Sequence, residues 1–132
     1  MRTTCCAMFI LVTLVGLVGC SVTVPAEKVY GVYVASYPYG TETITLNRDG
    51  TFVQSIAIKQ ENPVTVRGTW ESEPDKSETR VTFHGARAVD GGFDHPVKDW
   101  KTAPIGLVSY DVEIIWFRVE MGSGLMHPYM KQ

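Results

Sequence analysis

The stretch from Gly40 to Trp70 limits the fold more than any other part of the chain, because its hydrophobic pattern repeats every two residues. Three segments rich in Thr, Val and Ile are separated by the short polar runs 47–50 and 61–63. Both runs are rich in turn-forming residues, and Gly50 can supply the positive φ that a tight hairpin needs. The sequence therefore predicts three antiparallel strands joined by two tight turns.

Within this stretch, alternation predicts which side chains point inward. The cleanest inward row contains Val64, Val66, Gly68 and Trp70. Gly68 beside Trp70 indicates a strand that bends sharply, as at the corner of a barrel. Gln54 interrupts the inward row of the preceding strand, so it faces either a bulge or a polar interior.

Further strand patterns lie on both sides of this stretch. They cover Lys28–Ala35, Glu78–His84, Gly106–Asp111 and Val112–Met121 as one bent strand or two, and Leu125–Met130. The charged run Ser72–Ser77 is interpreted as a loop, and no amphipathic helix is evident. The predicted fold class is all-β: an antiparallel meander of about six to eight strands that forms a small barrel or sandwich, after an N-terminal signal segment.

The N-terminus reads as a secretion signal. An apolar run of 14 residues, Cys5–Val18, follows Arg2 and is shorter than the ~20 residues that a membrane-spanning helix needs. The run ends in Leu17-Val18-Gly19-Cys20, which resembles the lipobox of bacterial lipoproteins. The resemblance implies cleavage after Gly19 and acylation of Cys20, palmitate included. The alternative is an uncleaved N-terminal helix.

This interpretation divides the chain into a signal peptide (1–19), a lipidated N-terminus with a tether (20–27) and one β-barrel-like domain (28–132). Acyl chains on Cys20 would anchor the protein to a membrane, at ~0.8 kcal/mol per buried methylene. Ser21 follows the cysteine, which by the same resemblance implies the outer membrane of a bacterial envelope, facing the periplasm.

Composition excludes several classes of protein. All three cysteines lie at or before Cys20, so residues 21–132 can hold no disulfide framework and no thiolate metal site. A net charge of −2 gives no basic patch, and we expect no nucleic-acid partner. His84, His95 and His127 do not have the spacing of a zinc site, and we expect no metal and no cofactor.

Three motifs together resemble a known family. They are Thr43-Ile44-Thr45-Leu46-Asn47-Arg48-Asp49-Gly50-Thr51-Phe52, Gly68-Thr69-Trp70-Glu71 and Val81-Thr82-Phe83. This meander is similar to the small lipocalin-like domains of bacterial lipoproteins, over about Gly40–Phe83. In lipocalins proper the Gly-x-Trp motif lies on the first strand, whereas here it lies mid-chain. The resemblance therefore implies a fold and a location, and no functional residues.

Residues 85–105 form the longest segment without periodicity, and loops of this length are often functional. We predict a binding loop here with Phe93, Asp94, His95 and Trp100 as its candidate residues. Asp94 and His95, with Asp99 nearby, can also be drawn as a general-base pair. A polar turn is the favoured interpretation of that pair, because no nucleophile motif accompanies it.

The run Val112–Met121 is apolar on both faces, since Ile114 and Trp116 lie opposite Ile115 and Phe117. Either the long loop folds over the second face, or Ile114 and Trp116 form an interface with another molecule. Covering by the loop is the favoured alternative.

These observations predict a non-catalytic, lipid-anchored envelope protein that binds another macromolecule, inhibitor and immunity proteins included, or maintains the envelope. A possible partner is an envelope protein. The alternative is a lipocalin-like carrier of a small apolar ligand, with residues 85–105 as its lid. A hydrolase that uses Asp94 and His95 is the weakest hypothesis.

Overall fold

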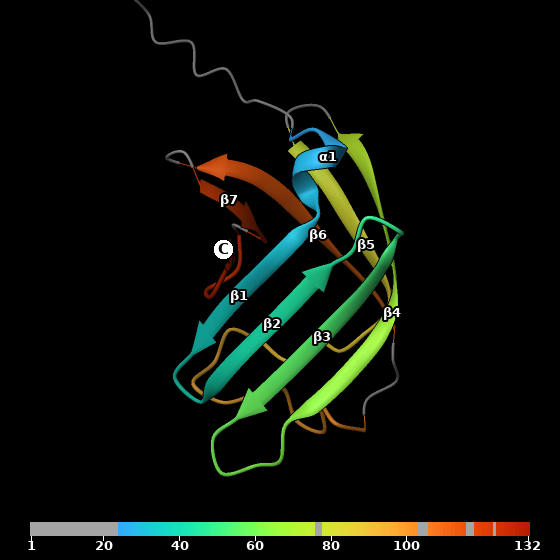
Figure 1. The fold of residues 1–132 in the computed structure, drawn as a ribbon. Helices are drawn as coiled ribbons and strands as arrows, with labels where there is room; N and C mark the ends of the chain where they lie inside the picture. Colours follow the sequence, from blue (N-terminus) through green and yellow to red (C-terminus); the bar gives the residue numbers. More distant parts are fainter. Residues whose placement is uncertain (1–23, 76–77, 103–105, 116–117, 123) are drawn as a thin grey trace, which may run out of the picture.

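The protein is an all-β, antiparallel meander closed into an eight-stranded barrel, as the sequence predicted (Figure 1). The computed structural model describes residues 24–75, 78–102, 106–115, 118–122 and 124–132. Its elements are α1 (Ala26–Val29), β1 (Gly31–Tyr37), β2 (Gly40–Leu46), β3 (Thr51–Ile58), β4 (Val64–Asp75), β5 (Glu78–Ala86), β6 (Gly106–Ile115), β7 (Arg118–Met121) and β8 (Tyr129–Lys131). Each strand pairs with the next, and β8 closes the barrel against β1.

The predicted central meander is confirmed as β2, β3 and β4. Asn47 and Thr51 close the first hairpin through their backbones at 2.9 Å and their side chains at 2.9 Å. Gly50 has φ 81°, the left-handed conformation that the turn requires. Gln54 is buried and points into the interior. Of the two predicted alternatives, a bulge or a polar interior, the structure therefore shows the polar interior.

Gly68 allows β4 to pass close to its neighbours. A Cβ at this position would lie 2.2 Å from the His84 carbonyl oxygen and 2.6 Å from Phe52 Cε1. Trp70, two residues on, is partly buried, and its indole Nε1 donates to the Asn47 carbonyl at 2.9 Å. The close approach and the anchored indole fit the predicted bend in this strand.

The structure corrects several predicted boundaries. The segment Lys28–Ala35 is not one strand, because α1 ends at Val29 and β1 begins at Gly31 and continues to Tyr37. The run Ser72–Ser77 is not a loop from its start, because β4 continues to Asp75 and pairs with β5 down to Asp75↔Glu78. Polar residues continue the strand here because its backbone stays paired with β5. The last strand is β8, which begins only after Pro128, a residue that cannot donate to a strand ladder.

The apolar run Val112–Met121 is two strands. The chain reverses between Ile115 and Arg118, and Val112 pairs with Met121 across the hairpin. A reversal changes the relation between position and face, so a single period of two cannot assign the whole run. Trp116 and Phe117 lie outside the described residues.

Closely packed side chains fill the barrel interior over the described residues. The largest with less than 2% exposure are Tyr33, Tyr129, Phe52, Phe83, Ile44, Ile56 and Met121. Phe52 and Phe83 meet edge to face, with ring centroids 5.1 Å apart. Burial of these rings supplies much of the hydrophobic stabilisation of the barrel. The sequence after Cys20 has no cysteine, so no disulfide bond within it adds to that stabilisation.

The segment before β1 packs against one end of the barrel. Val24 is 1% exposed, and its carbonyl accepts a hydrogen bond of 2.6 Å from Thr79 Oγ1 at the start of β5. Val29 is fully buried, and its carbonyl accepts a bond from the Tyr33 hydroxyl. The described part of the segment interpreted as a tether is thus attached to the barrel. No helix within the described ranges is long and apolar enough to cross a membrane.

Candidate functional site

The segment between β5 and β6 crosses the end of the barrel opposite α1 (Figure 1). Val89 is 1% exposed and Trp100 is 5% exposed, so both side chains pack against the barrel core. The backbone N–H of Val97 donates to the Val89 carbonyl at 2.9 Å, which folds the segment onto itself. The described residues 87–102, called the end loop below, therefore form a structured cover.

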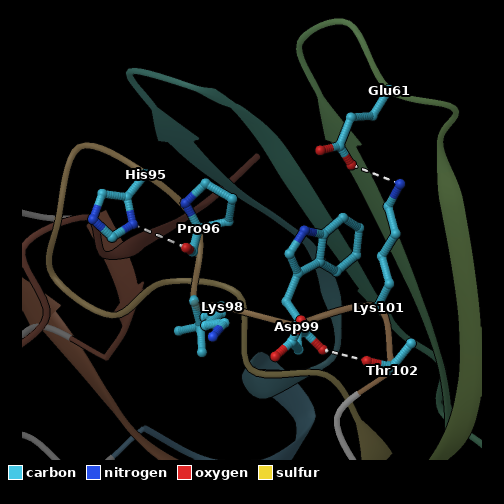
Figure 2. Close-up of a pocket in the computed structure, with 9 residues that line it drawn as sticks. Glu61, His95, Pro96, Lys98, Asp99, Lys101 and Thr102 are labelled. Atoms are coloured by element: carbon cyan, nitrogen blue, oxygen red, sulfur yellow. Dashed lines mark hydrogen bonds and ion pairs between the residues drawn. The ribbon is translucent and has the colours of Figure 1, made fainter.

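The end loop contains an open hollow of about 680 Å³ (Figure 2). Residues 95–102 line it, together with Glu61 from the turn between β3 and β4. Lys101 Nζ lies 2.7 Å from Glu61 Oε2, and this ion pair ties the loop to that turn. Asp99 has φ 59°, a left-handed conformation that turns the chain along the hollow.

The hollow combines apolar side chains with charged ones. Trp100, Pro96 and Val97 contribute the apolar lining, and Lys98, Asp99 and Lys101 contribute charge. Figure 2 shows Lys98 and Asp99 close together on the loop and the dashed ion pair between Lys101 and Glu61. An aromatic centre with a charged rim is the usual composition of a protein-binding surface.

Phe93 and His95 form an exposed stack on the same loop. Their ring centroids are 5.4 Å apart and their planes differ by 9°, while Phe93 remains 60% exposed. His95 also lines the hollow, so the stack and the hollow share a border. A large aromatic ring left mainly in water is a common anchor for a partner.

Below the end loop, the barrel interior contains a buried carboxylate. Glu42 is 0% exposed, and its carboxylate accepts hydrogen bonds from three neutral side chains. Its Oε2 accepts from the Tyr37 hydroxyl at 2.8 Å, and its Oε1 accepts from the Tyr129 hydroxyl at 2.8 Å and from Gln54 Nε2 at 2.6 Å. We call these four residues the Glu42 cluster.

Burial dominates the ionisation of this cluster. Burial raises the pKa of the Glu42 carboxyl above its ordinary value, and the hydrogen bonds from Gln54, Tyr129 and Tyr37 lower it in part. Burial also raises the pKa of the Tyr129 hydroxyl well above its ordinary value, and the nearby Glu42 adds to that increase. The cluster therefore stores a proton more readily than an exposed carboxylate would.

Gln54 connects the Glu42 cluster to the end loop. Its Nε2 donates to the Arg87 carbonyl at 2.7 Å, and its Oε1 accepts from the Arg87 backbone N–H at 2.8 Å. The side-chain amide thus pairs with the backbone at the first residue of the loop as a neighbouring strand would. The interior of the barrel determines where the loop begins.

Asp90 makes a second connection. Its Oδ1 accepts from the backbone N–H of Gly92 at 2.9 Å and from the Tyr39 hydroxyl at 3.4 Å. Its Oδ2 lies 3.2 Å from His127 Nδ1, in the connection between β7 and β8. The Asp90 side chain is 6% exposed, so this contact fastens the end loop to the C-terminal part of the chain.

The four residues predicted for a binding loop lie on the end loop but do not converge on one point. Phe93, Asp94 and His95 are exposed, whereas Trp100 is buried. His95 Nδ1 lies 3.1 Å from the Pro96 carbonyl oxygen. The hollow brings His95 and Trp100 together.

Of the three further predicted positions, only Ile114 lies within the described residues. Ile114 is 40% exposed on β6. Trp116 and Cys20 lie outside the described residues. Residues 24–75, 78–102, 106–115, 118–122 and 124–132 contain no group of three or more His, Cys, Asp and Glu side chains that could hold a metal ion.

The sequence analysis did not single out Glu42. Alternation could have found it, since Glu42 stands two residues before Ile44 and four before Leu46, both inward. A carboxylate in an otherwise apolar row would then have pointed to a polar interior together with Gln54. The donors Tyr37 and Tyr129 lie far apart in sequence, and only the closed barrel brings them together.

The two ends of the barrel differ in what they present. Val24, Thr79 and α1 lie at one end, where the chain arrives from residue 23. The hollow and the Phe93–His95 stack lie at the other end. Comparison with protein-family models, with curated proteins and with solved structures found no significant match to this chain.

Proposed function

We propose that this chain is a lipid-anchored protein of the bacterial cell envelope that binds another envelope protein through its end loop. The observation that carries the proposal is that the two ends of the barrel differ. The chain enters at the α1 end, and the exposed Phe93 and the hollow beside Trp100 lie at the opposite end. A lipid on Cys20 would therefore leave the end loop directed away from the membrane.

The composition of the end loop supports a protein as partner. Phe93 offers an exposed ring, and Lys98, Asp99 and the Lys101–Glu61 pair surround the hollow with charges of both signs. Such a rim favours a partner with complementary charges rather than a purely apolar surface. Gln54 and Asp90 fasten the loop, so little ordering is needed on binding.

Photo-crosslinking in a Gram-negative host tests the binding surface. A photoreactive residue is placed at Phe93 or Lys98, and the control carries it at Glu73, an exposed position on β4 near the α1 end. We expect one defined adduct from the end-loop positions and none from Glu73. The adduct must then be reproduced with the purified partner, with an affinity that falls at least tenfold on Phe93→Ala. Equal adducts from all three positions would reject the end loop as the binding surface.

The anchor is tested separately. The full chain should fractionate with membranes and carry acyl mass on its N-terminal peptide, and Cys20→Ser should lose both. A Cys5→Ser/Cys6→Ser chain is the matched control, because it alters cysteines that the lipobox resemblance does not use. Retained acylation in Cys20→Ser would contradict the lipoprotein proposal.

A second candidate, a carrier of a small apolar ligand, is favoured by the size of the hollow alone. Its volume of about 680 Å³ lies in the range of ligand sites, ~300–1,000 Å³. The dye N-phenyl-1-naphthylamine is a suitable probe. Saturable dye fluorescence that disappears in Trp100→Ala would support this candidate, and its absence would leave the protein-binding proposal alone.

A further inference from the structure

β6 is longer than the strand that covers one of its edges. β5 pairs with β6 from Gly106 to Val112. On the other edge, β7 pairs only from Val112 to Ile115. The register of β8 is with β1 and β7, so within the described residues neither β7 nor β8 pairs with the first half of β6.

The uncovered edge presents backbone hydrogen-bonding groups. Gly122 N–H donates to the Asp111 carbonyl at 2.8 Å, which places the backbone groups of Asp111 on the β7 side. In an antiparallel strand, alternate residues direct their N–H and C=O toward the same edge. Ser109 and Leu107 therefore direct theirs toward the same side, where no strand of the described residues pairs with them.

This edge lacks the usual features that prevent strand pairing. Residues 107–110 are Leu, Val, Ser and Tyr, with no proline and no charged side chain. Leu107 is 66% exposed, although leucine is normally buried in a sheet. Among the residues that the structure describes, the edge is thus without a strand partner at Leu107 and Ser109, and the Leu107 side chain is exposed.

A small hollow of about 190 Å³ lies beside the same edge. Its lining includes Ser109 and Tyr110 of β6 and Gly122, Gly124 and Leu125 of the connection after β7. Met126, the next residue of that connection, is 66% exposed. An open strand edge with a neighbouring side-chain pocket is the arrangement that binds an extended peptide by strand addition.

We propose that the edge of β6 at Leu107–Tyr110 binds an extended segment of a partner protein as an added strand, with one apolar side chain of that segment in the hollow beside Tyr110 and Leu125. Backbone pairing with Leu107 and Ser109 supplies affinity, and the hollow supplies selectivity. The hollow beside this edge shares no lining residue with the hollow of the end loop, and the proposal holds whether or not the end loop binds a protein.

The test uses the full chain in detergent micelles and a library of linear nonapeptides as the probe. Ser109→Pro removes the N–H that faces the open edge while leaving the ladder to β5, because the ladder uses Val108 and Tyr110. Ser109→Ala is the matched control, since it also loses the hydroxyl that lies 3.0 Å from Thr82 Oγ1 but keeps the N–H.

We expect selected peptides with apolar residues at alternate positions, which bind Ser109→Ala within twofold of the original chain and Ser109→Pro at least tenfold more weakly. Selection of no peptide, or equal binding to both variants, would overturn the proposal. Self-association of the original chain that Ser109→Pro abolishes would also overturn it, because the occupant would then be a second copy.

Gly124→Leu keeps the proposal testable if Ser109→Pro unfolds the barrel. Gly124 lines the hollow, and a Cβ built on it meets no atom within 4 Å, so a larger side chain can be added at this border of the hollow without a clash at its Cβ. We expect selected peptides to bind this variant at least fivefold more weakly, with unchanged thermal unfolding. Unchanged binding would show that the hollow does not receive a side chain. End-loop crosslinks at Phe93 should be the same in both variants, which separates this proposal from the one above.

Discussion

The hydroxyl of Tyr129 donates a hydrogen bond of 2.8 Å to Glu42 Oε1, although 87 positions separate the two residues in the chain. The bond joins β8 to β2 through the barrel interior and so connects the last strand to the first hairpin. Because the Glu42 side chain is fully buried, it has lost its hydrogen bonds to water. The hydrogen bonds from the surrounding donors offset the free-energy cost of that burial.

The first prediction concerns the pH dependence of stability. Burial raises the pKa of Glu42 in the folded chain, so at intermediate pH the folded state binds more protons than the unfolded state. The free energy of unfolding should therefore fall as pH rises from the ordinary carboxyl range through the pKa of the folded state. In Glu42→Gln, which stays neutral, this decrease should disappear.

Urea unfolding of the full chain between pH 4 and pH 8 measures this effect. Glu42→Gln should be close to the original chain at the acidic end and more stable than it at the alkaline end. Glu42→Leu is the contrasting variant, because it leaves three donors unsatisfied and should lose about 2–5 kcal/mol at every pH. Parallel curves for the original chain and Glu42→Gln would contradict the prediction.

The second prediction concerns Gln54 as the connection to the end loop. Gln54→Leu removes both hydrogen bonds to the Arg87 backbone, and also the bond to Glu42, while keeping the interior filled. The loop amides Val97 and Trp100 should then exchange hydrogen faster, because their backbone bonds depend on a fixed loop. Hydrogen-exchange mass spectrometry measures this, with amides of β2 and β3 as the internal reference. Unchanged exchange in the loop would mean that packing of Trp100 alone holds it.

The third prediction compares two glycines. Gly68→Ala places a Cβ 2.2 Å from the His84 carbonyl oxygen, so β4 or β5 must shift and the ladder between them must distort. We expect a loss of about 2–4 kcal/mol in the free energy of unfolding, in the upper range for a single substitution. Gly124→Ala, which enters open space, is the control and should change stability by less than about 0.5 kcal/mol. Similar unfolding midpoints for the two variants would count against the close approach at Gly68.

The fourth prediction concerns Asp90, which joins the end loop to the C-terminal connection. Asp90→Ala leaves the Gly92 N–H and the His127 ring without their carboxylate partner, and should cost about 1–3 kcal/mol. Asp94→Ala removes a carboxylate from an exposed position four residues away and should cost less than about 0.5 kcal/mol. Equal costs would show that Asp90 acts only as a surface charge. Guanidinium unfolding at pH 7 is sufficient for the comparison.

The period-two pattern from Gly40 to Trp70 determined the fold class by itself, because each of its turns is encoded by residues next to one another in the chain. Asn47 and Gly50 specify the first hairpin, and Val66 and Trp70 specify the face that meets the interior. Local chemistry of this kind needs no knowledge of distant residues.

Tertiary structure alone decided what the barrel encloses and what covers its end. Glu42 is one residue among polar neighbours in the sequence. Pairing of β2 with β1 and β3 brings Tyr37 and Gln54 to it, but Tyr129 reaches it only when β8 closes on β1. The reversal after Ile115 likewise depends on which strand is available to pair with β6. A sequence pattern indicates to which face of its own strand a side chain points. The residue that this side chain contacts depends on closure of the sheet, because closure brings together residues that are far apart in the chain.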